Sequence, residues 1–108
     1  MADRPPIYTV TVQLVDWTLG RTADIPKSQR FTFAQRLDNL TLDALMLVVE
    51  ALFTKGEARR QRLLALNIGL EKLRVLWRLV EGRRWVNDSS SLTEAAVLGE
   101  VQQALWDC

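Results

Sequence analysis

The sequence predicts an all-α protein, built as an up-down-up-down antiparallel four-helix bundle. Three observations lead to this fold class: apolar residues recur at three- and four-residue spacing along most of the chain, the breaks between these segments are short, and no segment requires a sheet. Short connections force neighbouring helices to run in opposite directions. With 108 residues, of which 48% are apolar and 25% charged, the chain is predicted to form one globular domain spanning residues 1–108.

The first segment, residues 7–21, fits two structures. Tyr8, Val10 and Val12 alternate with polar residues as in a half-buried strand, and β-branched residues favour strands. Val10 and Leu14 also share the four-residue spacing of a helix. The helical pattern of everything that follows favours the helix.

A loop from residue 21 to 27 leads to a second helix, predicted over residues 28–54. Ser28 is a suitable N-cap, and Lys55-Gly56 ends the helix because glycine tolerates the left-handed conformation common at helix ends. The interior carries two apolar stripes: Phe33, Leu37, Leu40, Ala44, Leu47 and Ala51 on one, and Leu42, Leu45, Val49 and Leu52 on the other.

The third helix, predicted over residues 57–81, has the strongest pattern in the chain. Its seam consists of Leu63, Leu66, Leu70, Leu73, Trp77 and Val80, and a flanking apolar set consists of Leu64, Ile68, Val75 and Leu79. A turn from Gly82 to Asp88 follows. Ser91 and Glu94 then form a capping box for a last helix that reaches residue 106. Its inward residues are Leu92, Ala95, Leu98, Val101 and Leu105.

These helices carry more apolar width than the interior of one bundle uses. We therefore expect subunits to associate side by side into a homo-oligomeric ring. The alternative is that the extra residues are ordinary surface hydrophobics, since folded monomers also expose much apolar surface.

The composition excludes most familiar catalytic chemistry. Histidine is absent, so no imidazole base and no histidine-ligated metal site can form, and the one cysteine, Cys108, excludes an intrachain disulfide and a multi-cysteine zinc site. The acid pairs Asp38 with Asp43 and Glu71 with Glu81 are interpreted as solvated helix charge. We expect no enzyme activity, no cofactor and no metal. No signal peptide or membrane span is expected, and a cytoplasmic location fits best.

A net charge of +1 hides a strong asymmetry. Residues 55–84 contain nine basic and three acidic residues, whereas residues 85–108 contain four acidic residues and no basic one. Eleven of the fourteen basic residues are arginines, which favour bidentate contacts with phosphates and carboxylates. The candidate anion-binding residues in this region are Lys55, Arg59, Arg60, Arg62, Lys72, Arg74, Arg78, Arg83 and Arg84.

Spacing suggests how these basic residues are arranged. Lys55, Arg59 and Arg62 share one side of the third helix, and Arg74 with Arg78 are expected to continue a similar side. The alternative is a compensated solvent-exposed face. In that case Glu71 pairs with Arg74, Glu81 pairs with Arg78, and the acidic last helix neutralises more of the charge by packing alongside.

Two tryptophans have different expected roles. Trp77 belongs to the seam of the third helix and is predicted to be core. Trp85 follows two arginines in a turn, so it is either an exposed ring for stacking on nucleic-acid bases or an anchor for the loop.

The residues from Ile25 to Leu37, Ile-Pro-Lys-Ser-Gln-Arg-Phe-Thr-Phe-Ala-Gln-Arg-Leu, resemble a signature of one bacterial four-helix-bundle family. This family comprises the accessory variability determinants of diversity-generating retroelements and the proteins encoded in ribosomal RNA intervening sequences. The pattern from Leu70 to Arg74, the helix spacing and the total length are similar as well. The resemblance also favours a helix for the first segment.

The resemblance implies a homopentameric barrel and a non-enzymatic partner of a reverse transcriptase that binds RNA or DNA during mutagenic retrohoming. Lys27, Arg30 and Arg36 match the family's basic signature positions. Independently of the resemblance, Lys27 and Arg30 open a helix, where exposed backbone N–H groups favour an anion. The alternative is that this segment only caps the helix and fixes its packing.

Overall fold

The computed structural model describes residues 6–85 and 88–107, and the side chains in these ranges except those of residues 88–93. These residues form four α-helices and no strand: α1 (Pro6–Thr22), α2 (Gln35–Leu52), α3 (Gly56–Gly82) and α4 (Asp88–Trp106). The all-α prediction is confirmed, and the first segment is a helix. Cys108 lies outside the described residues.

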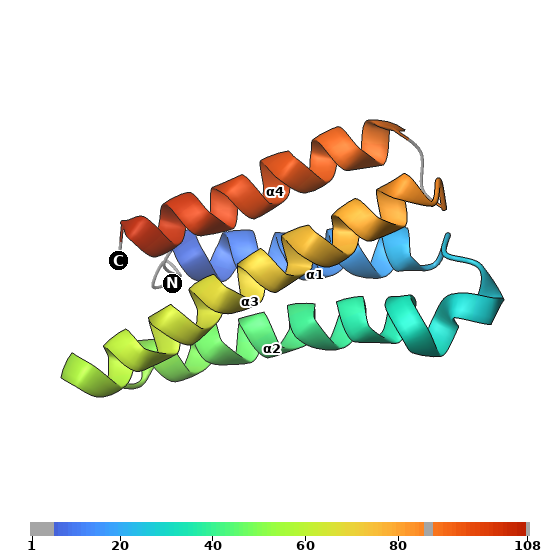
Figure 1. Ribbon diagram of the computed structural model, residues 1–108. Coiled ribbons are helices and arrows are strands. Elements are labelled where there is room, and N and C mark those ends of the chain that lie inside the picture. The colour runs from blue at the N-terminus through green and yellow to red at the C-terminus, as the bar shows by residue number, and fades with distance from the viewer. Residues whose placement is uncertain (1–5, 86–87, 108) are drawn as a thin grey trace.

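The four helices surround one core. α1 packs against α2 and α4, and α3 packs against the same two helices, so α1 and α3 lie diagonally across the molecule (Figure 1). The α1–α2 and α3–α4 connections lie at one end, which we name the connection end, and the α2–α3 connection lies at the other. The molecule measures about 42 Å by 23 Å by 22 Å.

The seam predicted for the third helix forms the centre of the core. Leu66, Leu70, Leu73 and Val80 are fully buried, and the Trp77 ring lies 5.0 Å from that of Trp17 on α1. The prediction that Trp77 is core is therefore confirmed.

Buried threonines explain how a segment rich in β-branched residues forms α1. The Thr11 hydroxyl donates to the Ile7 carbonyl oxygen at 2.6 Å, and Thr41 on α2 makes the same type of bond to Leu37 at 2.7 Å. Such bonds to the carbonyl four residues earlier satisfy the hydroxyl inside the helix, so it can be buried without an unpaired donor.

The prediction of a single helix over residues 28–54 is wrong at its start, because α2 begins only at Gln35. The chain forms a 3₁₀ turn (Lys27–Gln29) and a π-helical turn (Arg30–Ala34) before α2 begins. Ser28 lies inside the 3₁₀ turn rather than at a cap. The wide π turn changes the register of the side chains, and it leaves Phe31 80% exposed while Phe33 packs on Trp85.

The predicted start of the last helix is also wrong. α4 begins at Asp88, so Ser91 lies within the helix and does not cap it. Ala95, expected to face the core, is exposed, and Glu94 is buried instead. The reason is spacing: Glu94 lies four residues before Leu98, which places it on the buried stripe. The side chain of Leu92 is outside the described residues.

Candidate nucleic-acid interface

The connection end gathers cationic side chains from two segments that are far apart in sequence. The connection-end patch consists of Lys27, Arg30, Arg83 and Arg84, all exposed. The first two belong to the α1–α2 connection and the last two follow α3. The rings of Phe33 and Trp85 join these segments, with centroids 5.2 Å apart in an edge-to-face arrangement. This aromatic contact fixes the two basic pairs at the same end of the bundle.

Local geometry keeps the connection-end patch open to solvent. The guanidinium carbon of Arg83 lies 5.5 Å from the centre of the Trp85 ring, which holds the arginine by a cation–π contact. Arg84 has a positive φ of 58°, so the chain turns sharply after α3. The ion pairs within the described part of the chain use none of the four patch residues. The four cations therefore lie outside the described ion pairs, at the same end of the bundle as the exposed ring of Phe31.

Trp85 is half-buried between Phe33 and Arg83. Of the two roles that the sequence left open, the geometry favours the loop anchor. The exposed ring at this end is instead that of Phe31.

A second basic group lies at the opposite end of the molecule, at the N-cap and in the first two turns of α3. It consists of Lys55, Arg59, Arg60 and Arg62. Part of its charge is compensated, because Arg62 Nε lies 3.3 Å from Glu50 Oε1 on α2 and Arg60 lies 3.5 Å from Glu57. Exposed pairs of this kind contribute little to stability but reduce the local positive potential.

The expectation that Arg74 continues the side of α3 that carries Arg62 is wrong. Arg62 points to Glu50 on α2, whereas Arg74 pairs with Glu71 at 3.0 Å on the side of α4. Gln102 of α4 donates to the same Glu71 oxygen. Twelve residues separate the two arginines, which corresponds to roughly 120° around the helix axis. The predicted ion pair between Glu71 and Arg74 is present. Arg74 therefore fits the alternative in which acidic neighbours compensate the positive charge of the third helix.

α4 brings a carboxyl group against the arginines in the second half of α3. Glu94 is 8% exposed, and its pKa is raised from 4.5 to about 7, first by burial and then by the nearby Glu81 carboxylate. Arg74 and Arg78 act in the opposite direction and lower it. Glu81 Oε1 is buried, and no hydrogen bond to it is found among the described side chains. At this position burial outweighs the attraction of two cations.

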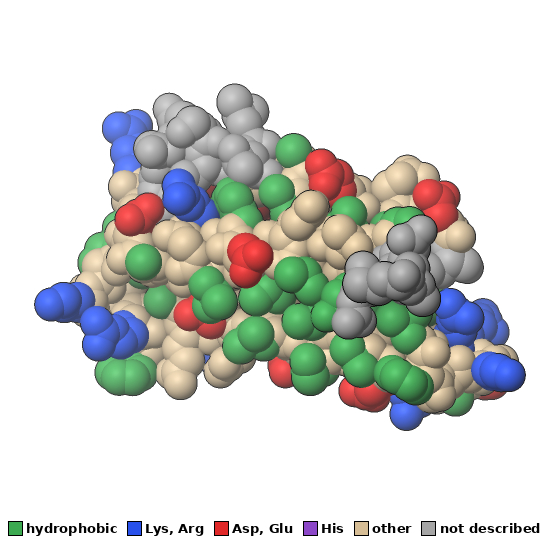
Figure 2. Space-filling model, turned by 180° about the vertical axis from the view of Figure 1, so that it is seen from behind, with side chains coloured by type: hydrophobic (Ala, Val, Ile, Leu, Met, Phe, Trp, Pro, Cys, Tyr) green, Lys and Arg blue, Asp and Glu red, His purple; other side chains and the backbone are tan. Residues whose placement is uncertain are grey.

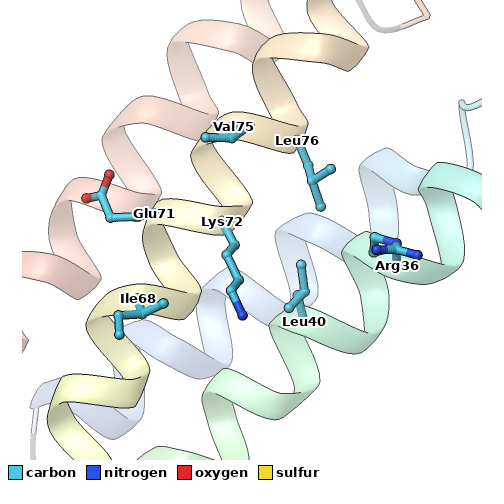
Figure 3. Close-up of a pocket in the computed structure, with 7 residues that line it drawn as sticks. All are labelled: Arg36, Leu40, Ile68, Glu71, Lys72, Val75 and Leu76. Carbon is cyan, nitrogen blue, oxygen red and sulfur yellow. The ribbon is translucent and has the colours of Figure 1, made fainter.

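The remaining candidates, Arg36 and Lys72, line a groove of about 500 Å³ between α2 and α3 (Figure 3). Leu40 and Leu76 point into the groove, and the Lys72 side chain reaches from α3 toward α2. Glu71 points away toward α4. The groove thus has apolar walls and a cationic rim.

The described residues contain no group of three or more acidic or cysteine side chains placed to hold a metal ion. Within the same part of the chain, no helix has the length and apolar character needed to cross a membrane. Comparison of the chain with protein-family models, curated proteins and solved structures finds no match.

Two features of this site were missed by sequence reasoning. The exposure of Phe31 follows from the π turn, and the contact of Phe33 with Trp85 joins residues 52 positions apart. The aromatic residues beside each basic pair were the available signal, but spacing along the chain does not show that two distant loops meet.

Proposed function

We propose that the protein is a non-enzymatic accessory protein of a diversity-generating retroelement, which binds a reverse transcriptase and RNA or DNA through basic surfaces. Sequence resemblance supports the retroelement context. The connection-end patch supports nucleic-acid binding, because four exposed cations from two connections lie at the same end of the bundle as the exposed ring of Phe31. Arginines that contact phosphates and a ring that stacks on bases together bind single strands with little sequence preference.

The proposal includes an up-down-up-down antiparallel bundle that assembles into a homopentameric ring in the cytoplasm. The positions of the connections at alternate ends support the antiparallel order. The flanking apolar set of α3 supports assembly, since Leu64, Ile68, Val75 and Leu79 are all 48–56% exposed. A ring would repeat the connection-end patch around its rim and add avidity to weak individual contacts.

The first prediction concerns the connection-end patch. A variant with Lys27, Arg30, Arg83 and Arg84 all replaced by glutamine should bind single-stranded RNA of about 20 nucleotides more weakly at low salt. Each phosphate contact on a single strand contributes about 0.7 to the slope of log affinity against log salt concentration, so the slope should flatten by about 3. Fluorescence anisotropy over a salt series measures both quantities.

The matched comparison replaces Arg59, Arg62, Arg74 and Arg78 by alanine. Because Arg62 and Arg74 already pair with glutamates, this variant should flatten the salt slope less. Circular dichroism must show the same helicity for both variants. Unchanged affinity and slope in the connection-end variant would show that this patch does not bind nucleic acid.

A second candidate function is a protein–protein adaptor of the same bundle family that does not bind nucleic acid. The observation in its favour is the pairing of Arg60, Arg62 and Arg74 with glutamates, which lowers the positive potential along α3. Failure of the unmodified protein to bind RNA or DNA at low salt, together with capture of the reverse transcriptase, would favour the adaptor.

A further inference from the structure

One long side of the bundle, formed by α1 and α2, is apolar at its surface. We name as the α1–α2 face the exposed residues Leu19, Leu42, Met46 and Phe53. Leu42 and Met46 lie four residues apart on α2, Phe53 follows directly after that helix, and Leu42 shares a hollow with Leu19 of α1. In Figure 2 hydrophobic side chains gather over these two helices, and the blue basic side chains lie toward the ends of the molecule.

Carboxylates predominate at the border of the α1–α2 face, although Arg30 lines the hollow of Leu19 and Leu42 at one end. Asp16 lies three residues before Leu19 and Asp43 lies three residues before Met46, so each carboxylate neighbours the face on its own helix. Both aspartates are exposed. The two helices hold four acidic residues and only two basic ones, Arg21 and Arg36.

A separate surface of the bundle carries an apolar stripe on α3. We name as the α3 face the residues Leu64, Ile68, Val75 and Leu79. At about 100° per residue they lie within roughly 60° of one another around the helix. The groove of Figure 3 continues this face toward α2, since Ile68 and Val75 line both.

Cations predominate at the border of the α3 face, although Arg60 pairs with Glu57 there. Arg60 lies four residues before Leu64, Lys72 lies between Ile68 and Val75, and Arg78 follows Val75 by three residues. All three cations are exposed. Glu71 also lines the groove, and its carboxylate is held by Arg74 and Gln102 on the side of α4.

The two faces are therefore complementary to each other and not to themselves. An apolar stripe with cations at its edges matches an apolar surface with carboxylates at its edges, whereas two α3 faces or two α1–α2 faces would bring like charges together. The area is sufficient, since a side of about 42 Å by 22 Å can accommodate the roughly 800 Å² per partner that a stable interface buries.

We propose that the α1–α2 face of one copy covers the α3 face, including the Arg36 and Lys72 groove, of the next copy. The contact is heterologous: each copy uses a different surface toward each neighbour, and such contacts form rings when the rotation closes. The inference rests on the assembly contained in the proposed function, and it names the two surfaces that make it.

Two single variants test this pairing. Ile68→Asp disables the α3 face and Met46→Asp disables the α1–α2 face. Each position is at least half exposed, so the fold should tolerate the change. A buried aspartate without a partner should lower the association constant by at least about 100-fold. Each variant alone is therefore expected to be a monomer by analytical ultracentrifugation, with unchanged helicity.

The decisive measurement is the equimolar mixture of the two variants. It retains one working α3 face and one working α1–α2 face, so it should form a 1:1 heterodimer and nothing larger. Gln13→Asp, at an exposed position of α1 outside both faces, is the control and should assemble like the unmodified protein.

Three outcomes would overturn the pairing: a monomeric unmodified protein, self-association of either single variant, or a mixture that stays monomeric. RNA binding of the connection-end patch is measured separately on the monomeric variants. A failed pairing and a failed nucleic-acid function therefore give different results.

Discussion

At the scale of single residues, the buried carboxyl group of Glu94 makes the free energy of unfolding depend on pH. Its pKa is about 7 in the folded protein, against 4.5 for an ordinary glutamate. Between these values the folded state holds a proton that the unfolded state releases, so the free energy of unfolding falls as the pH rises from 4.5 to 7. Well above pH 7 Glu94 is ionised in both states, and the folded state bears the full free-energy cost of the buried charge. Well below pH 4.5 it is protonated in both states, and this cost is absent.

Glu94→Gln removes this cost. We expect the variant to be about 1–2 kcal/mol more stable than the unmodified protein at pH 8 and equally stable at pH 4. Urea unfolding at the two pH values measures the difference. Glu100→Gln, at an exposed position two turns later on α4, is the control and should change stability by less than about 0.5 kcal/mol at either pH. Equal effects of Glu94→Gln at pH 4 and pH 8 would contradict the account.

At the scale of elements, two glycines of α3 should respond in opposite ways to the same substitution. Gly56 begins the helix with φ of +60°, a conformation that costs residues with a Cβ atom about 1–2 kcal/mol. Gly69 lies in the helix interior, and a Cβ atom built there meets nothing within 4 Å. Gly56→Ala should therefore destabilise the protein by about 1–2 kcal/mol, and Gly69→Ala should stabilise it by about 0.5–1 kcal/mol. Thermal unfolding followed by circular dichroism compares the two variants. A Gly56→Ala variant more stable than the unmodified protein would contradict the need for glycine at this positive φ.

The elements also show which parts of the fold are readable from the sequence. The seam of α3 is predictable because burial selects one stripe of a long helix, and Leu66 to Val80 follow it without interruption. The start of α2 is not predictable in the same way. The 3₁₀ and π turns before it differ from an α-helix by one residue in hydrogen-bond spacing, and the same side chains fit all three.

The candidate site also has parts that the sequence predicts and parts that it does not. Composition identifies the basic residues, and the Glu71 to Arg74 pair follows from spacing on one helix. The meeting of Lys27 and Arg30 with Arg83 and Arg84 depends on how two loops pack through Phe33 and Trp85. Such a contact between distant segments is a tertiary property, and no local pattern contains it.

At the scale of the whole molecule, the face shown in Figure 2 has its positive charge toward the two ends and apolar surface between them, and the connection-end patch lies at one of these ends. If copies pair side by side, their connection-end patches lie next to one another on one rim. A long single strand then contacts several patches, and its second and later contacts form at a high effective concentration. A short nucleic-acid strand that occupies only one patch gains no affinity from the patches of neighbouring copies.

The last prediction uses this difference in length. Met46→Asp, which blocks assembly but lies outside the connection-end patch, should weaken binding of a single-stranded RNA of about 60 nucleotides by roughly 100-fold. It should change binding of an RNA of about 8 nucleotides by less than about twofold, because one patch spans that length. Anisotropy titrations with both RNAs at one salt concentration give the comparison, with Gln13→Asp as the control. Equal weakening for the two lengths would mean that Met46 acts within the binding surface itself. Unchanged binding for both would mean that nucleic acid engages single copies, so that avidity around a ring plays no part.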